Sequence, residues 1–424
     1  MSSLAYAALW LFAFSLPWEN ALVAAFPGVS LVSKVTGGLA LAAAVGFVLL
    51  SGRVRRWKSM HVAGLLFVVW AGAELFFLHT GNRLPYRYTT FVQLFVVMWI
   101  VWELAPSWSR QLGLMVAYVF GSYVAALATI LQYRREGGAL RRFAALQTDP
   151  NTLAMTLALA IPMAWYLSAT SRNATLRWAC RAYILVGLVA VALTASRGGM
   201  LATMVALLIV PLTMTRLSPG RLAMAITVLA VSGAAAVAYV PTQIVERLAT
   251  TGTEVEDMSL GGRFGIWKSG VRALTGRPLT GYGVGMWRTA VSPWLGPNPQ
   301  VAHNSFLSIA VETGLIGLAF YLAMFVAVFR ATRQLPVLER RYAFVQMATL
   351  VVAMMPLSWD DHKAVWFTLA ALLGFAYATG KRIPTAVPAV PPRRPAPVMR
   401  PVAARRGRDP YLNTPRDINP DSAT

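Results

Sequence analysis

The chain has 424 residues, of which 57% are hydrophobic and only 13% are charged. Charged residues make up about a quarter of a typical soluble domain, so this composition excludes an ordinary water-soluble protein. The formal net charge of +22 would suggest nucleic-acid binding in a soluble protein, but here the basic residues lie between apolar runs and near the C-terminal end. We therefore attribute most of them to membrane orientation and to contact with anionic lipid headgroups.

Apolar runs long enough to cross a bilayer, which takes roughly 18–20 residues, recur along the chain. We predict an all-α polytopic membrane protein with about 12 transmembrane helices. The short loops on one side carry more Lys and Arg than those on the other, which predicts that both chain ends face the cytoplasm. The predicted helices cover residues 3–17, 33–51, 60–79, 88–105, 112–134, 151–169, 176–195, 200–216, 221–240, 304–330, 342–358 and 363–380.

These helices divide the chain into four parts. Residues 1–240 contain helices 1–9, residues 241–302 form one long loop on the outer side, and residues 303–380 contain helices 10–12. Residues 381–424 are rich in Pro, Arg and Ala, which predicts a disordered basic tail in the cytoplasm. The loop is longer than a plain connector needs to be, so we expect it to be functional.

One segment of the long loop has the periodicity of a helix. Its apolar residues recur at i, i+3, i+7 and i+10, which places them on one narrow stripe. This pattern predicts an amphipathic helix that lies on the membrane surface. The stripe consists of Phe264, Trp267, Val271 and Leu274.

Arginines are concentrated at one place on the outer side, where the orientation rule would place few. Arginine on this side suggests an anionic ligand, and a guanidinium can bind a pyrophosphate through two parallel hydrogen bonds. The alternatives are a local error in the topology and snorkelling of these side chains to lipid headgroups. The cluster consists of Arg134, Arg135, Arg141 and Arg142, and charge placement adds Arg288 in the long loop.

A further arginine, Arg197, lies in the run LTASRGGM between two apolar runs. Its position marks an abrupt turn at the outer surface. Two glycines follow it, and glycine lets a backbone approach a ligand closely. Arg197 is therefore a second candidate for phosphate binding. The alternative is an arginine that snorkels from a helical hairpin.

His303 lies where the long loop meets the tenth predicted helix. An imidazole at the membrane boundary can titrate near neutral pH and act as a general base. Glu312 is an ionisable group on that helix and so a functional candidate. Nine residues of continuous helix correspond to about 180° and about 13.5 Å, so we expect no direct dyad between the two. We expect Glu312 to bond a neighbouring helix, beside the small-residue face of Ala310, Gly314 and Gly317.

No pattern in the sequence points to a metal or a nucleotide cofactor, and we expect neither. The single cysteine, Cys180, excludes a cysteine-based metal cluster. The run 360–362 has the sequence Asp-Asp-His, but three adjacent residues rarely converge on one ion. The glycines of residues 276–287 lack the strand-turn-helix unit that a dinucleotide-binding fingerprint requires.

Four runs of residues resemble the O-antigen ligase and O-antigen polymerase superfamily of bacterial membrane glycosyltransferases. Their order and their positions relative to the membrane match the family. The shared helix layout extends the resemblance over residues 1–380 and leaves out the tail. The runs are Asp149-Pro150-Asn151 with Leu153 and Ala154; Ser196-Arg197-Gly198; Arg263-x3-Trp267 with Pro278-Leu279-x-Gly281-x-Gly283; and His303-Asn304-x2-Leu307-x4-Glu312-x-Gly314-x2-Gly317.

The resemblance implies a GT-C-like fold in the bacterial inner membrane, with the active site on the periplasmic face. It implies an inverting, metal-independent transfer of O-antigen polysaccharide from undecaprenyl pyrophosphate to lipid A-core. His303 would deprotonate the acceptor hydroxyl, while Arg197 and Arg263 would hold the donor pyrophosphate. The supporting residues would be Asn151, Asn304 and Glu312.

Three alternatives to a ligase stay open. Polymerases of the superfamily often have two comparably long outer loops, whereas this sequence predicts one. Oligosaccharyltransferases that glycosylate proteins usually carry a larger outer region late in the chain. A lipid-linked sugar flippase or other transporter would need charged residues along its helices at mid-membrane, and such residues are scarce here. A ligase is therefore the function we expect.

Overall fold

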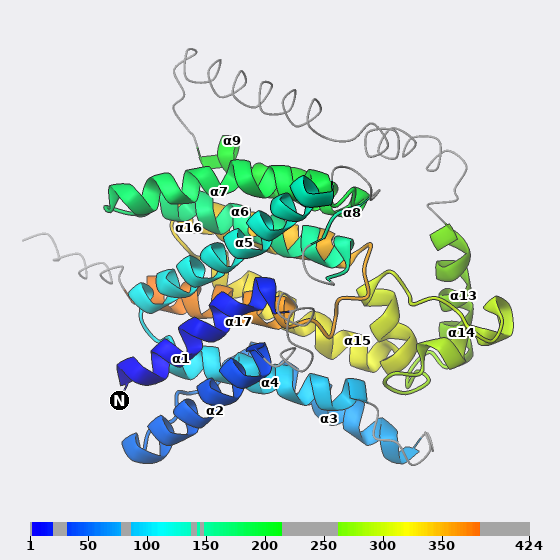
Figure 1. The fold of residues 1–424 in the computed structure, drawn as a ribbon. Helices are drawn as coiled ribbons and strands as arrows, with labels where there is room; N and C mark the ends of the chain where they lie inside the picture. The colour runs from blue at the N-terminus through cyan, green and yellow to red at the C-terminus, as the bar shows by residue number, and fades with distance from the viewer. Residues whose placement is uncertain are drawn as a thin grey trace, which may run out of the picture. The chain divides into compact units, whose positions relative to one another are not determined.

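A computed structural model of the chain describes residues 2–19, 32–77, 86–136, 142–144, 148–213 and 262–381. In these ranges the regular structure is entirely helical, which confirms the all-α prediction (Figure 1). The described residues lie within one compact unit, Met1–Arg382, and the second unit, Ile383–Thr424, lies outside them. The predicted helix 221–240, Arg141, most of the predicted tail and residues 241–261 of the long loop also fall outside the described ranges.

Helices occupy all the predicted transmembrane ranges that fall within the described residues. They are α1 (Ser2–Ser15), which continues into the short 3-10 helix η1 (Leu16–Trp18), α2 (Val32–Ser51), α3 (Ser59–Phe77), α4 (Tyr86–Leu104), α5 (Trp108–Glu136), α6 (Pro150–Thr170), α7 (Ala174–Leu193), α8 (Arg197–Leu207), α9 (Ile209–Thr213), α15 (Ser305–Thr332), α16 (Val337–Met354) and α17 (Lys363–Gly380).

Seven of these helices are long and apolar enough to cross a membrane. They make the chain a polytopic membrane protein, and the count of 12 stays a prediction. The described part of the predicted helix 200–216, up to residue 213, contains two shorter helices, α8 and α9. The seven are α2, α3, α5, α6, α7, α15 and α17.

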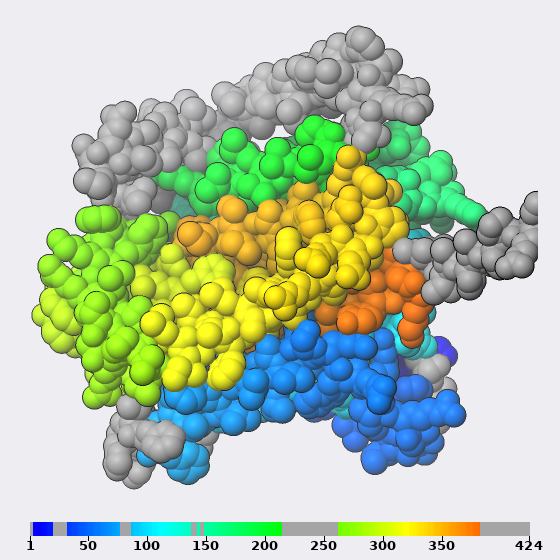
Figure 2. All heavy atoms as spheres, turned by 180° about the vertical axis from the view of Figure 1, so that it is seen from behind, coloured from blue at the N-terminus to red at the C-terminus, as the bar shows by residue number. Residues whose placement is uncertain are grey.

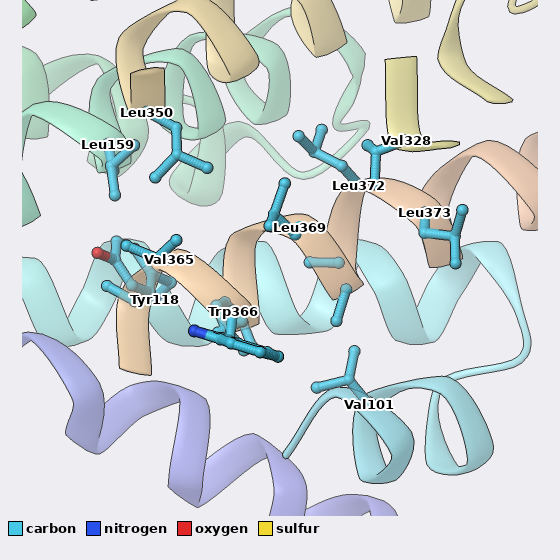
Figure 3. Packing of buried hydrophobic residues seen from close by; sticks show 14 of the residues in the cluster. Val101, Tyr118, Leu159, Val328, Leu350, Val365, Trp366, Leu369, Leu372 and Leu373 are labelled. Carbon is cyan, nitrogen blue, oxygen red and sulfur yellow. The ribbon is translucent and has the colours of Figure 1, made fainter. Parts of the chain in front are cut away.

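The α17 helix lies in the middle of the helical bundle and packs against α4, α5 and α15. In Figure 3 its residues Val365, Trp366 and Leu369 are surrounded by side chains of neighbouring helices, such as Tyr118 of α5 and Leu350 of α16. The α17 helix is apolar on all sides because neighbouring helices bury it on all sides. Lipid is as apolar as these side chains, so close packing, rather than escape from water, stabilises this core.

The described part of the long loop, residues 262–302, contains α13 (Arg263–Gly276) and α14 (Trp287–Leu295). Both helices pack against α15, and Figure 2 shows them in yellow-green beside the yellow residues of α15. The predicted apolar stripe of α13 does not form one free face. Trp267 and Leu274 pack inward with buried Ile266, while Phe264 and Val271 stay about half exposed. The apolar periodicity therefore predicted the helix correctly, but only two of the four stripe residues, Trp267 and Leu274, pack inward.

The α15 helix is kinked at Gly314, whose backbone has φ +64°. Residues 278–283 of the loop bind the backbone groups that the kink frees. The N–H of Tyr282 donates to the Val311 carbonyl over 3.0 Å, and the N–H of Leu315 donates to the Pro278 carbonyl over 2.8 Å. A side chain at Gly314 would overlap the Leu279 carbonyl. The expectation of one continuous helix was wrong, because the loop satisfies backbone groups that a kink leaves unpaired.

Candidate functional site

His303 precedes α15 rather than lying on it, so the helical geometry assumed for it does not apply. Its backbone has φ +46°, a left-handed conformation in which histidine is one of the better-tolerated residues. The backbone N–H of His303 donates to the Oγ of Ser358 over 3.1 Å. The loop between α16 and α17 therefore holds the backbone of this histidine.

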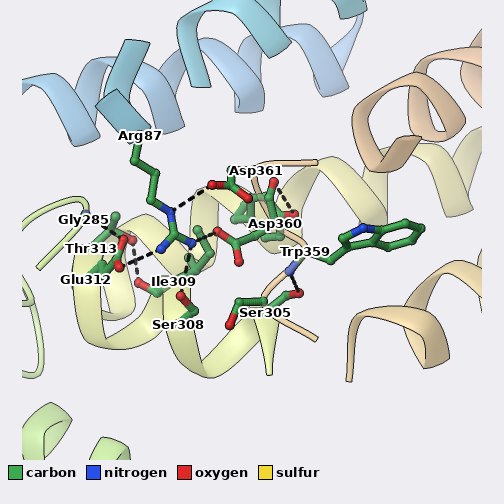
Figure 4. Close-up of polar contacts among 12 residues, drawn as sticks. Arg87, Gly285, Ser305, Ser308, Ile309, Glu312, Thr313, Trp359, Asp360 and Asp361 are labelled. Carbon is green, nitrogen blue, oxygen red and sulfur yellow. Dashed lines mark hydrogen bonds and ion pairs between the residues drawn. The ribbon is translucent and has the colours of Figure 1, made fainter. Parts of the chain in front are cut away.

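A second serine joins the same loop to the start of α15. The Oγ of Ser305 donates to the Leu357 carbonyl over 2.8 Å and accepts from the Trp359 N–H over 2.8 Å. Ser305 is fully buried, and Figure 4 shows it beside Trp359. Asn304 caps α15, because its side-chain oxygen accepts from the Leu307 N–H over 3.0 Å. The residues on either side of His303 are thus fixed by hydrogen bonds.

The imidazole of His303 is half-buried, and its Nδ1 has no hydrogen-bond partner among the described residues. Burial lowers the pKa of His303 below 6.5, and the positive charge of Arg263 lowers it further. The carboxylate of Asp149 opposes this effect by favouring the charged form. The lowered pKa leaves the imidazole neutral near pH 7, so it can accept a proton.

Asn151 joins two of the four runs. Its side-chain oxygen accepts from the Oγ of Ser196 over 2.9 Å and from the Nη2 of Arg142 over 2.7 Å. Arg142 also donates through Nε to the Thr194 carbonyl over 3.1 Å. The run that begins at Asp149 and the run that contains Arg197 therefore form one hydrogen-bonded unit, which includes one of the predicted outer arginines.

The two glycines after Arg197 allow α8 to begin in a crowded position. A side chain at Gly198 would come within 2.6 Å of Pro356 and 2.9 Å of Met155. A side chain at Gly199 would overlap Ala154 of α6. Because glycine has no side chain, the start of α8 approaches both α6 and the loop that holds His303. Arg197 is half-buried at this start.

Arg263 begins α13, directly after Gly262, whose backbone has φ +82°. The indole Nε1 of Trp267 on the same helix donates to the Ala302 carbonyl over 3.0 Å. This bond attaches α13 to the residue before His303. It explains why Arg263 is close enough to lower the pKa of that histidine.

The other predicted arginines differ in position. Arg134 and Arg135 are exposed at the C-terminal end of α5, and no contact described in the structure joins them to His303. Arg288 is exposed on α14 and lines a pocket next to His303. Arg141 lies outside the described residues. The structure therefore places Arg263 near His303, joins Arg142 through Asn151 to the run that contains Arg197, and places Arg288 on the pocket.

Arg87 is a site residue that the sequence did not reveal. From α4 it donates through Nη1 to the Oε1 of Glu312 over 2.8 Å and through Nη2 to the Oγ of Ser308 over 3.1 Å. It also pairs with Asp360, and its Nε lies 3.6 Å from Asp361 (Figure 4). The expectation that Glu312 bonds a neighbouring helix is confirmed.

The other oxygen of Glu312 accepts from the N–H of Gly285 over 2.9 Å. Glu312 therefore anchors the glycine-rich turn of the long loop to α15.

The two aspartates beside Trp359 face Arg87. Within the described residues, no three metal-ligating side chains converge on one point. Burial raises the pKa of Asp360, although the charge of Arg87 opposes the rise.

A pocket of about 400 Å³ opens beside this ion-pair network. It is adjacent to the histidine, because Ala302 and the hydrogen-bond partner Ser358 both line it. The remaining lining residues are Tyr86, Arg87, Gly285, Trp287, Arg288, Val301, Ser308, Glu312 and Asp361.

The fold defines a polytopic membrane protein, and its site combines a neutral histidine with arginines from several helices. Residues 182–322 match the family described as O-Antigen ligase (Wzy_C). The match covers about a third of the chain and includes Arg197, Arg263 and His303. It supports assignment of the chain to the O-antigen ligase family, and with it a membrane enzyme of the glycosyltransferase type. No curated protein matches the chain.

Proposed function

We propose that the protein is an O-antigen ligase. It would transfer O-antigen polysaccharide from undecaprenyl pyrophosphate to lipid A-core at the periplasmic face of the bacterial inner membrane. The observation that carries this proposal is the pair of charged residues that act on the His303 imidazole. Arg263 from the long loop and Asp149 from the start of α6 both act on its imidazole. The family match to residues 182–322 supplies the reaction class.

In this reaction His303 acts as the general base. A hydroxyl oxygen of the acceptor attacks the anomeric carbon of the donor sugar and forms the new glycosidic bond. The bond from that carbon to the pyrophosphate oxygen breaks, and the hydroxyl proton passes to the imidazole. Attack from the face opposite the leaving group inverts the anomeric configuration. Undecaprenyl pyrophosphate leaves with the electron pair of the broken bond.

Arg197 and Arg263 hold the pyrophosphate and balance the charge that develops on it. A guanidinium suits this role because it stays charged and binds phosphate oxygens in pairs. Arg142 joins them through its bond to Asn151. Arg263 has a second effect, since its charge lowers the pKa of His303 and keeps the base neutral. Roles for Arg134, Arg135 and Arg141 stay predictions from charge placement.

The proposal keeps the predicted topology, with about 12 transmembrane helices in a GT-C-like arrangement and both chain ends in the cytoplasm. Single cysteines introduced at exposed positions test it, after the native Cys180 is replaced by serine. A cysteine at Arg288 should react with a thiol reagent that cannot cross the inner membrane, whereas one at Arg56 should react only after the membrane is opened. The reverse pattern would contradict the orientation.

The reaction is tested with purified protein, undecaprenyl-pyrophosphate-linked glycan and lipid A-core, without ATP or added metal. We expect glycan to appear on lipid A-core, and transfer to vanish in His303→Ala. Elongation of the donor glycan in the absence of lipid A-core would instead identify a polymerase. Movement of the donor across proteoliposomes without transfer would identify a flippase.

A further inference from the structure

The pocket beside His303 has the lining of a sugar site. Its volume of about 400 Å³ falls within the range of roughly 300–1,000 Å³ that small-molecule sites occupy. Two aromatic residues, Tyr86 and Trp287, line it together with the hydroxyl groups of Ser308 and Ser358. Trp287 is held in place, because its Nε1 donates to the Gln300 carbonyl over 2.9 Å. Aromatic rings with a few fixed polar groups are the usual walls of such a site.

The charges of the pocket do not favour an anion. Its partly buried guanidinium, Arg87, is already paired with Glu312, Asp360 and Asp361. Two of these carboxylates, Glu312 and Asp361, also line the pocket and would repel a phosphate. Arg142, which donates to Asn151, and Arg197 and Arg263, which belong to two of the runs, do not line the pocket. The pocket and this group of arginines therefore differ in the ligand they suit.

His303 adjoins the pocket through its neighbours without lining it. Ala302 and Ser358, which adjoin it in sequence or by hydrogen bond, line the pocket. Arg263 and Asp149, which act on its imidazole, do not line the pocket. A base that deprotonates an acceptor hydroxyl must contact the acceptor, while the arginines contact the donor.

We propose that this pocket binds the sugar ring of the acceptor that carries the attacking hydroxyl, and that the ring bound there bears hydroxyl groups rather than phosphate. This inference rests on the proposed transfer reaction and adds the place where the acceptor is selected. Asp361, whose side chain is 38% exposed, accepts from sugar hydroxyls, and Arg288 donates to them. Tyr86 covers one face of the ring.

A site of this kind would select its acceptor by hydrogen bonds. A ring that lacks a hydroxyl opposite Asp361 or Arg288 would lose a hydrogen bond to a charged group, so it would bind more weakly. Arg87 and Glu312 act differently, since they hold the pocket walls together and their charges are already paired. We therefore assign selection of the acceptor to Asp361 and Arg288. The Arg87–Glu312 pair holds the walls of the pocket in position.

The proposal is tested by direct binding to the full-length protein in detergent. One probe is core oligosaccharide freed from lipid, and the other is inorganic pyrophosphate. Arg288→Ala and Asp361→Asn should each weaken oligosaccharide binding about tenfold, as expected when a charged hydrogen bond is lost. Both should leave pyrophosphate binding unchanged. Arg272→Ala, an exposed arginine on α13 outside the pocket, is the matched control and should bind both probes normally.

Tyr86→Ala adds a variant with little risk to folding, since Tyr86 is 78% exposed. It too should weaken oligosaccharide binding. Unchanged oligosaccharide binding in all three pocket variants would overturn the proposal, as would a wild-type protein that does not bind the oligosaccharide. Loss of pyrophosphate binding alone would show an anion site instead.

Binding and transfer separate the two proposals. A protein that transfers glycan while its pocket variants bind the oligosaccharide normally would overturn the pocket alone. A protein that binds the oligosaccharide through the pocket but never transfers glycan would overturn the proposed ligase reaction alone.

Discussion

The Nη1 of Arg87 lies 2.8 Å from the Oε1 of Glu312, and the two residues are 225 positions apart in the sequence. The Glu312 side chain is fully buried and that of Arg87 is 18% exposed. The pair joins α4 to α15, and the contact of Arg87 with Asp360 adds the loop before α17. A single guanidinium therefore connects three elements around the pocket beside His303.

Removing Arg87 should be strongly destabilising. Arg87→Ala leaves two fully buried carboxylates, Glu312 and Asp360, without their counter-charge. Breaking a buried pair in this way costs about 3–5 kcal/mol. Thermal and denaturant unfolding in detergent measures the loss. The exposed Arg56→Ala is the control and should stay within about 0.5 kcal/mol of wild type. Equal stability of the two variants would contradict the role given to Arg87.

The pH dependence of transfer should follow the charges around His303. Because a general base must be neutral, the rate should rise with pH through the pKa of His303, which lies below 6.5. Arg263→Gln removes a positive charge that lowers this pKa, so the acid limb of the profile should move to higher pH. Asp149→Asn removes a negative charge that raises it, so the limb should move to lower pH.

Both shifts are read from kcat/KM between pH 4 and 8, which reports the pKa values of the free enzyme. Asparagine preserves the helix cap that Asp149 provides to α6, so Asp149→Asn separates charge from capping. Shifts in the same direction for both variants, or no shift in either, would contradict the assignment of the acid limb to His303.

The kink of α15 should tolerate no side chain at Gly314. In Gly314→Ala the added methyl group overlaps the Leu279 carbonyl, and φ +64° is a strained conformation for alanine. We expect the loop to detach from α15, which limited proteolysis of residues 276–287 and a lower unfolding temperature would reveal. Gly265→Ala is the matched control, because its helical position on α13 is open. Equal protease resistance in the two variants would argue against the kink.

Loss of the Asn151 side chain should affect the donor more than the acceptor. Asn151→Ala removes the oxygen that binds both Arg142 and Ser196. We expect KM for the undecaprenyl-linked donor to rise about tenfold, the cost of about one charge-assisted hydrogen bond. KM for lipid A-core should change little. Asn173→Ala, which removes the exposed cap of α7, provides the comparison. A rise in the acceptor KM alone would contradict the proposal that the arginines joined to Asn151 bind the donor.

Much of the fold was predictable because long apolar runs determine helices in a membrane. Asp149 and Asn304 stand where a capping side chain is needed, and each caps its helix. The resemblance assigned His303 and Arg263 to one reaction, and the hydrogen bond from Trp267 to Ala302 attaches α13 to the residue before His303.

The network around Arg87 was not predictable, because its partners lie on distant segments and a sequence shows charge without pairing. Asp360 and Asp361 were considered only as metal ligands. The partner of Glu312 was expected on a neighbouring helix, but its identity depended on how α4 packs. Gly314 was taken as a helix-packing residue. Its positive φ depends on the loop residue Leu279, which the local sequence does not place.

The most direct test of the account measures glycan transfer to lipid A-core by purified His303→Ala. A general base contributes about 10²–10⁴-fold to the rate. We predict a loss of at least about a hundredfold in kcat, with an unfolding temperature and pyrophosphate binding like those of wild type. Transfer at the wild-type rate by a folded His303→Ala protein would contradict the central claim that His303 deprotonates the acceptor.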